Sequence, residues 1–244
     1  MIYGDLVARV DFNMTRESAF SYRCNACKRC CRNKAIRVNP YEILRLARRL
    51  GLSTTDFIAR HTEAGGTVLR SRDDGNCGFL GEHGCSVHSD RPLACRLYPL
   101  ARWVSPEGEE SFGHLAPHPH SEGVYGAAAT VEAYLDQQDV APLFAMSERY
   151  GALYARMLEA LETIDPLEIE RKPERRTAVD EQPAGSVASS WLDIDGTLAD
   201  EPPLDDLAMA VSRHIEAIEA CIEQLRREAG AAGQPQPISG TTGP

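Results

Sequence analysis

The eight residues Cys24–Cys31 constrain this chain more than any other stretch, because they read CNACKRCC and carry four thiols. A second group, Cys77, Cys85 and Cys95, follows, so that seven of the eight cysteines fall between positions 24 and 95. Core packing does not require thiols at this density, and closely spaced thiols in a reducing compartment are typical metal ligands. The pattern predicts a lobe built around bound metal.

The charge near the first cysteines is strongly positive. Residues 21–60 contain ten Lys or Arg and only Glu42 and Asp56, a net charge of +8, although the whole chain carries −10. Cations beside thiolates lower thiol pKa values and offset the charge of a thiolate-bound centre. A nucleic-acid patch is the alternative, but the cations lack interleaved aromatic residues and the chain is acidic, so we do not expect a nucleic-acid partner.

No stretch of the sequence has the composition of a signal peptide or a membrane anchor. The first twenty residues carry Asp and Glu, and no apolar run approaches the ~18 residues that span a bilayer. We therefore expect a cytoplasmic protein with no membrane partner.

Capping signals and apolar periodicity predict a mostly helical chain. Asn39, Pro40 and Glu42 form a capping-box start for a helix that Gly51 ends, and Ser53 begins a second, shorter helix. Apolar spacing predicts helices at 130–162, with Thr130 as its cap, and at about 204–229. Between the short helix that Ser53 begins and residue 130, we expect short strands near 67–69, 85–87 and 111–115 and a helical turn at 91–97.

These elements predict an α+β fold, predominantly helical, with an irregular metal-binding lobe of short strands and turns. We expect a cysteine-cluster domain at 1–162, an irregular connection at 163–203, a C-terminal helix at 204–229 and a disordered tail at 230–244. The apolar stripe of the C-terminal helix packs on the body or on a protein partner.

Two overlapping Cys-x-x-Cys pairs make the first group a strong metal-binding signal. Such a turn lets two sulfurs reach one ion at ~2.3 Å, and the shell needs two more ligands from elsewhere. Neighbouring side chains point apart, so Cys30 and Cys31 are expected to serve different metal atoms or centres. Buried free thiols and a disulfide set are the structural alternatives. Cys221, alone on the last helix, is expected to be an ordinary thiol.

An imidazole could complete a shell. His118 is the histidine candidate, because it lies with His114 and His120 in a Pro-rich turn after the second cysteine group. His83 and His88 flank Cys85 and could bind or lie on the surface, whereas His61 and His214 are expected to be structural. The predicted metal ligands are Cys24, Cys27, Cys30, Cys31, Cys77, Cys85, Cys95 and His118.

The cysteine pattern resembles the YkgJ-type cysteine-cluster family, described as zinc- or iron-chelating. The resemblance covers about residues 20–140 and rests on Cys24-x2-Cys27-x2-Cys30-Cys31, the helix with Glu42, Cys77-x-Phe79-Leu80, Gly84-Cys85-x-Val87 and Arg91-Pro92-x-x-Cys95-Arg96-x-Tyr98-Pro99. Many members carry a further Cys-Pro-Gly after the last element. Here that region reads PHPHSEG from Pro117, so an eighth thiol is missing and His118 is a candidate to replace it.

The resemblance and the thiol count imply a metal-binding protein. It would hold an iron-sulfur cluster or iron, with zinc as the alternative cofactor, in a metal-handling or redox role; metal ions would be its partners. A flagellin lysine N-methylase is among the relatives, so an enzyme of the protein lysine N-methylase type is the second function, and whether the chain is an enzyme stays open. The pattern differs from that of bacterial ferredoxins, which have a Cys-Pro and no adjacent cysteines.

The run from Asp193 to Leu198 matches the Asp-x-Asp-Gly-Thr of haloacid-dehalogenase-type phosphatases. That chemistry needs a strand before the motif and a large α/β core after it. The preceding Ala188, Ser189 and Ser190 form a poor strand and only 49 residues follow Asp195, so an acidic turn is the preferred interpretation.

Overall fold

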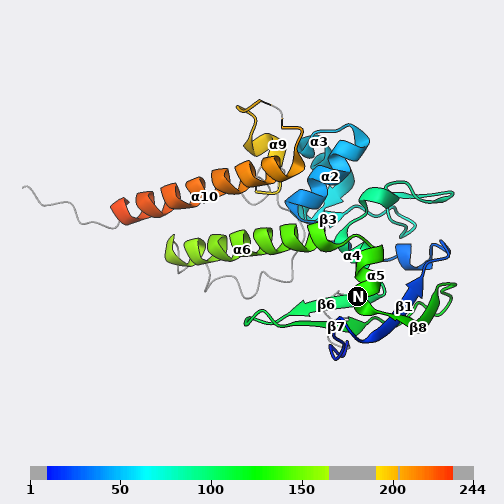
Figure 1. Cartoon of the computed structure of the whole chain (residues 1–244). Helices are drawn as coiled ribbons and strands as arrows, with labels where there is room; N and C mark the ends of the chain where they lie inside the picture. The colour runs from blue at the N-terminus through cyan, green and yellow to red at the C-terminus, as the bar shows by residue number, and fades with distance from the viewer. Residues whose placement is uncertain (1–9, 165–190, 203, 233–244) are drawn as a thin grey trace, which may run out of the picture.

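The computed structural model describes residues 10–164, 191–202 and 204–232. Its long helices α6 (Ala141–Ile164) and α10 (Leu207–Ala232) run side by side away from the rest of the molecule (Figure 1). Helices α2 (Pro40–Leu50), α3 (Thr54–His61) and α9 (Ile194–Thr197) lie on the α10 side of α6. This arrangement is the predicted α+β, mostly helical fold.

The strands are short and pair as separate two-stranded antiparallel sheets. A bulge shifts the register of the β1–β8 pair after Ala19, and the β6–β7 pair aligns Arg102 with Phe112. The pairs are β1 (Ala19–Arg23) with β8 (Val124–Thr130), β2 (Thr62–Glu63) with β3 (Val68–Leu69), β4 (Leu80–Gly81) with β5 (Gly84–Cys85), and β6 (Leu100–Val104) with β7 (Glu110–His114).

The helix starts that the sequence predicted after the first cysteine group are confirmed. Asn39 and Glu42 form a reciprocal capping box at α2, and Gly51 ends that helix in the left-handed conformation at φ 67°. The Ser53 side chain caps α3 by accepting from the amide of Asp56 at 3.0 Å. These local signals suffice because the side-chain caps accept from amides that the first helical turn leaves unpaired, and the amide of Gly51 donates to carbonyls of the last turn.

The predicted helix at 130–162 is two helices. Thr130 caps α5 (Val131–Gln137) as expected, but Asp139 then adopts a left-handed φ of 50° and α6 starts at Ala141. Pro142 has no amide hydrogen and so favours the first turn of a new helix over the interior of a long one. The 24-residue α6 still supplies core residues, including Leu143, Tyr150 and Leu153.

The last helix begins and ends about three residues later than its predicted span of 204–229. The Asp206 carboxylate accepts from the amide of Met209 at 2.6 Å, which makes Asp206 the N-cap signal that the apolar stripe alone missed. Val211, Ile215 and Ile222 pack against α6 and α2 in one apolar cluster. The predicted connection lies outside the described residues at 165–190, and the predicted tail does so from residue 233.

Two other apolar clusters position the cysteines. Cys77 and Cys85 pack against a cluster that contains Phe57, Phe79 and Val87. Leu97, two residues after Cys95, belongs to a cluster formed by β1, β6, β7 and α5. Helix α4 (Leu93–Leu97) carries Cys95, and its Leu93 packs against both this cluster and the cluster of α2, α6 and α10.

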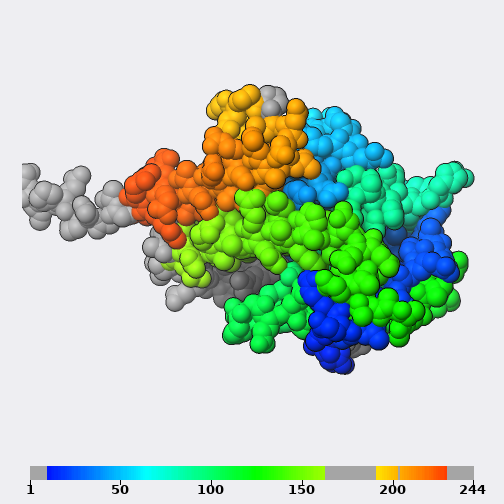
Figure 2. Space-filling view, viewed as in Figure 1, coloured from blue at the N-terminus to red at the C-terminus, as the bar shows by residue number. Residues whose placement is uncertain are grey.

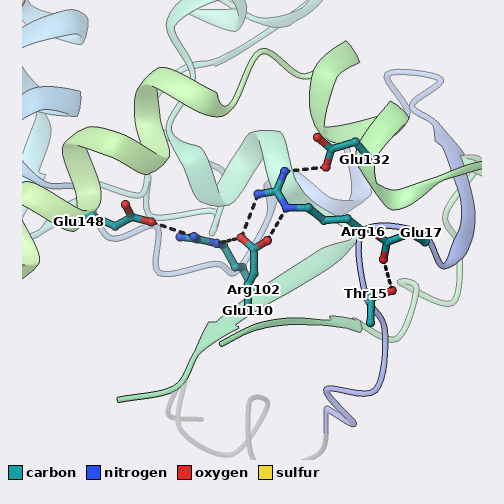
Figure 3. Close-up of polar contacts among 7 residues, drawn as sticks. All are labelled: Thr15, Arg16, Glu17, Arg102, Glu110, Glu132 and Glu148. Atoms are coloured by element: carbon teal, nitrogen blue, oxygen red, sulfur yellow. Dashed lines mark hydrogen bonds and ion pairs between the residues drawn. The ribbon is translucent and has the colours of Figure 1, made fainter. Parts of the chain in front are cut away.

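An ion-pair network joins the N-terminal segment to the β6–β7 hairpin and the helices behind it (Figure 3). Glu110 on β7 pairs with Arg16 at 2.5 Å and with Arg102 on β6. Arg16 also pairs with Glu132 on α5 at 2.6 Å, and Arg102 with Glu148 on α6 at 2.8 Å. Because Glu110 is largely buried, with 17% of its side chain exposed, these pairs orient the hairpin more strongly than isolated surface pairs would.

Among the described residues, no helix combines the length and apolar character that crossing a bilayer requires.

Candidate metal centre

The first cysteine segment follows β1 without regular secondary structure from Cys24 to Lys28. Ala26 and Lys28 both adopt left-handed backbone conformations, at φ 53° and 65°, which non-glycine residues seldom adopt outside functional sites. The Sγ of Cys24 accepts from the amide of Ala26 at 3.4 Å. A short 3-10 helix, Arg29–Cys31, then places the last two thiols of the segment.

The second cysteine group comes to the first through backbone pairing. The amide of Cys77 donates to the carbonyl of Cys31 at 3.0 Å, and Asn33 donates to Gly75 at 2.8 Å. Cys85 pairs with Leu80 across the β4–β5 hairpin, and the amide of Leu80 donates to the carbonyl of Cys77 at 2.9 Å. Positions far apart in sequence are thus held together by main-chain hydrogen bonds.

Glu42 positions the third segment. Its Oε1 accepts from the amide of Leu93 at 2.7 Å, at the start of α4, while its Oε2 accepts from the amide of Asn39 at 2.9 Å. The side chain is only 5% exposed, and this burial raises the pKa of its carboxyl. The capping-box motif revealed the second contact but not the first, which ties α2 to the helix that carries Cys95.

Two arginines of the Arg-Pro-x-x-Cys-Arg motif fix α4 from its other side. Arg96 is 6% exposed and donates to the carbonyls of Arg91, Gln138 and Ser89. Arg91 donates to the carbonyl of His88 and to the side-chain oxygen of Gln138, each at 2.7 Å. These arginines hold the backbone around Cys95, and the charge of Arg91 also favours the thiolates of Cys95 and Cys85 against the larger opposing effect of burial.

The thiols interact electrostatically. Burial raises the pKa of Cys95, and its neighbours Cys77 and Cys85 raise it further because adjacent thiolates repel one another. Burial and Cys77 likewise raise the pKa of Cys85. The pKa of Cys31 is also raised, first by its hydrogen bond with Cys30 and by burial, and further by Cys95 and Cys77. Cys31, Cys77, Cys85 and Cys95 therefore form one electrostatic neighbourhood, built from three chain segments.

One expectation about the adjacent pair is wrong. The side chains of Cys30 and Cys31 do not point apart; they share a hydrogen bond, because the 3-10 turn brings the two thiols together. That bond lowers the pKa of Cys30 to about 7 and raises the pKa of Cys31. Whether the two sulfurs serve different metal atoms stays a prediction.

Asn25 and Cys27 contact a different neighbour, the loop that follows His118. The amide of Glu122 donates to the Sγ of Cys27 at 3.5 Å, and the Asn25 side chain donates to the carbonyl of Glu122 at 2.8 Å. A Cβ added at Gly123 would lie 2.5 Å from the Tyr22 ring, so this close approach of the loop to β1 requires glycine.

His118 lies exposed on this loop. Its Nδ1 accepts from the amide of His120 at 3.1 Å, and no hydrogen bond joins its ring to a cysteine. His114 packs instead on Phe20 and Tyr125, His88 contacts Arg91, and His61 stacks on Phe57 and Phe79. His118 as a metal ligand stays a prediction, which is supported by the contact of its loop with Cys27 through the amide of Glu122.

A tyrosine cluster beside the thiols was not predicted. The hydroxyls of Tyr98 and Tyr125 lie 3.3 Å apart, and Tyr22 packs on both rings. Burial is the main cause that raises the pKa values of Tyr22 and Tyr98, and Cys30 contributes to both. Only the Tyr98-Pro99 motif gave any sequence signal, because the other two tyrosines lie on strands that the sequence did not predict.

The donor set fits a thiolate-bound metal, because seven thiols fall within residues 24–95 and two of their sulfurs already accept hydrogen bonds from backbone amides, as metal-bound thiolates do. All eight cysteines are free. Within residues 10–164, 191–202 and 204–232, no three Cys, His, Asp or Glu side chains are arranged closely enough to hold a metal ion as they stand. The grouping of ligands into centres therefore stays a prediction.

The Asp193–Leu198 motif has a structural role in this fold. Asp193 caps α9, a single helical turn, by accepting from Gly196, and it also accepts from the hydroxyls of Thr54 and Thr55. Asp195 accepts from the amide of Thr54 at 2.7 Å and pairs with Arg48. Both carboxylates hold the start of α3, and the phosphatase interpretation is not supported.

Comparison with known families matches residues 23–118 to the CxxCxxCC family model, described as a "putative zinc- or iron-chelating domain". The YkgJ-type resemblance agrees with this match. The match includes all seven clustered cysteines and His118 and ends before His120 and Cys221. The description supports metal binding and does not choose between zinc and iron, and it gives no support to the lysine N-methylase alternative. Searches of curated proteins and of solved structures gave no match.

Proposed function

We propose that this chain binds iron through its clustered thiols, as an iron-sulfur cluster or as thiolate-bound iron, in a metal-handling or redox role. The observation that carries the proposal is the convergence of Cys31, Cys77, Cys85 and Cys95 from three segments into one electrostatic neighbourhood. Cys30 adjoins this group through Cys31, while Cys27 adjoins the His118 loop.

Iron is favoured over zinc because seven thiols exceed the four ligands of one tetrahedral ion and suit a centre with several metal atoms. Bound iron would supply one-electron redox chemistry. The chain's own contribution is to hold the thiols, to keep Cys95 in place through Glu42 and α4, and to surround the thiolates with donors and cations that offset their charge. Reduced thiols suit a cytoplasmic location.

The test is to purify the protein without oxygen, to measure iron, zinc and acid-labile sulfide per chain, and to record the visible spectrum. We expect iron with sulfide and broad absorption near ~400 nm. A colourless protein with about two zinc ions, no sulfide and no iron uptake on anaerobic reconstitution would replace this proposal with closed structural zinc shells.

A further inference from the structure

A pocket with a strongly positive lining lies beside the first cysteine segment, where residues 27–32 meet residues 72–82 at one end of the molecule (Figure 2). Its volume is about 510 Å³. Four cations line it, and Cys27 and Glu82 are also part of its wall. We call this site the basic pocket and define it by Lys28, Arg29, Arg32 and Arg72.

Among the described residues, no ion pair joins a carboxylate to the cations of the basic pocket, although hydrogen bonds from Asn76 and the charges of Arg72 and Arg32 lower the pKa of the Asp74 carboxyl. Lys28 donates to the carbonyl of Glu82, Arg72 to the carbonyl of Leu80, and Arg32 to the carbonyl of Asp74 at 3.5 Å. The Asp74 carboxylate accepts instead from the amide and side chain of Asn76. Backbone carbonyls orient the side chains without neutralising them, so their positive charge remains available to a ligand.

Several other arginines of this chain behave differently. Arg16, Arg45, Arg48 and Arg102 each form an ion pair with Asp or Glu. Arg70 and Arg96 donate to backbone carbonyls as the pocket residues do, but they do not line the basic pocket, where four cations face one hollow. Positive charge is therefore concentrated at the basic pocket, and a bound anion would neutralise it.

We propose that the basic pocket binds a small polycarboxylate anion, and that this anion brings the metal to Cys27 as its chelate. Arginine forks bind carboxylates with paired hydrogen bonds, and three arginines around about 510 Å³ leave room for several carboxylates on one ligand. The position of Cys27 in the wall places a thiol next to the bound chelate. The delivery step rests on the proposed function, whereas anion binding does not.

The competing explanation is that these cations serve only to offset the charge of the metal centre. The two explanations differ in what the metal-free protein does. A pocket for an anion binds its ligand before any metal is present, whereas counter-charges for a centre matter only once the thiolates hold metal.

The test titrates citrate, inorganic phosphate and a short single-stranded oligonucleotide into chelator-treated, metal-free protein by calorimetry at low salt. The variants are Arg32→Gln and Arg72→Gln, and the control is Arg60→Gln, an exposed arginine that pairs with Asp56. We expect citrate to bind more tightly than phosphate or the oligonucleotide, and each pocket variant to weaken citrate binding about tenfold while the control does not.

Measurements of metal uptake test the delivery step separately from anion binding. We expect both pocket variants to take up aqueous metal ions fully but to take up metal from its citrate complex more slowly than the wild type. Tighter binding of phosphate or oligonucleotide, or unchanged citrate binding in the variants, would overturn the polycarboxylate pocket. Loss of metal uptake from aqueous ions in the variants alone would overturn the delivery step, because the cations would then act on the metal centre itself. If the protein holds no metal but citrate binds as expected, the proposed function fails and the anion site stands.

Discussion

The amide of Cys77 donates a 3.0 Å hydrogen bond to the carbonyl oxygen of Cys31, and this bond joins the two cysteine groups. An isolated bridge between Arg32 and Asn76 continues the contact. The backbone thus brings together two predicted ligands that are 46 positions apart, and the apolar cluster behind Cys77 and Cys85 supports them. Metal binding and folding of this lobe are therefore expected to be coupled, since the same segments contribute to both.

The first prediction concerns a single ligand. Cys95→Ser should lose metal and lower the melting temperature together, because a hydroxyl is a poor substitute for a thiolate and the lobe loses the stabilisation that bound metal provides. Metal content per chain and thermal unfolding measure the two effects. Cys221→Ser is the matched control, because Cys221 is exposed on α10 and far in sequence from the segment that the family model matches. Full metal content in Cys95→Ser would remove Cys95 from the ligand set.

The second prediction concerns His118. Its replacement by Ala should weaken one centre, whereas its replacement by Cys should preserve the metal stoichiometry, because a thiol at this position would supply the ligand that related sequences place after the Tyr-Pro element. His120→Ala is the neighbouring control; it keeps the backbone amide that donates to His118 Nδ1. The readouts are metal content and the visible spectrum. An unchanged spectrum in His118→Ala would exclude the imidazole as a ligand.

The third prediction concerns Glu42, the residue that positions α4. Glu42→Gln replaces one accepting oxygen by an NH2 group, so either the amide of Leu93 or that of Asn39 must face a donor. Leaving a buried donor unsatisfied should cost about 1–3 kcal/mol of unfolding free energy, measured by urea denaturation. Glu63→Gln, at the exposed position of β2, is the control.

Metal content separates this positioning role from a general loss of stability. At temperatures where Glu42→Gln is fully folded, we expect weaker metal retention against a chelator than in the wild type, because Cys95 is then held less firmly. Equal metal retention by the two proteins would mean that Glu42 caps α2 but does not position Cys95.

Local signals predicted the parts of this structure that depend on neighbouring residues. The capping box of Asn39 and Glu42, the Ser53 cap and the Gly51 stop are each set within one helical turn, and all are present as expected. The break at Asp139 was missed because apolar periodicity continues across it, although Pro142 carried the signal.

The contacts between distant segments could not be predicted from the sequence. Nothing near Glu42 indicates that its Oε1 accepts from Leu93, 51 positions away. The shared hydrogen bond of Cys30 and Cys31 depends on a 3-10 turn that CNACKRCC does not specify, and the alternation expected of an extended chain gave the wrong orientation. For Asp193 and Asp195 the sequence likewise favoured an acidic turn over a catalytic motif, but it did not indicate their partners, Thr54 and Arg48.

The fourth prediction concerns His214, which is fully buried between α10 and α6. Its Nδ1 lies 3.1 Å from the Tyr150 hydroxyl, and its Nε2 has no partner among the described residues. Burial lowers its pKa to about 4, against an opposing effect of Asp193. An unfolded chain would take up this proton near pH 6.5, so the folded state loses stability as pH falls from about 6.5 to 4 and no further below.

The loss should approach about 3 kcal/mol of unfolding free energy at pH 4, from the size of the shift. Urea denaturation between pH 4 and 7 measures it, with His214→Leu as the comparison. That variant gives up the Tyr150 contact, so it starts less stable at pH 7, but its stability should depend less on pH because an apolar side chain binds no proton. His61, His88 and His114 also have lowered pKa values and contribute equally to both proteins, so they cancel in the difference. Parallel pH profiles for the two proteins would mean that His214 is not the group whose protonation weakens the packing of α10 on α6.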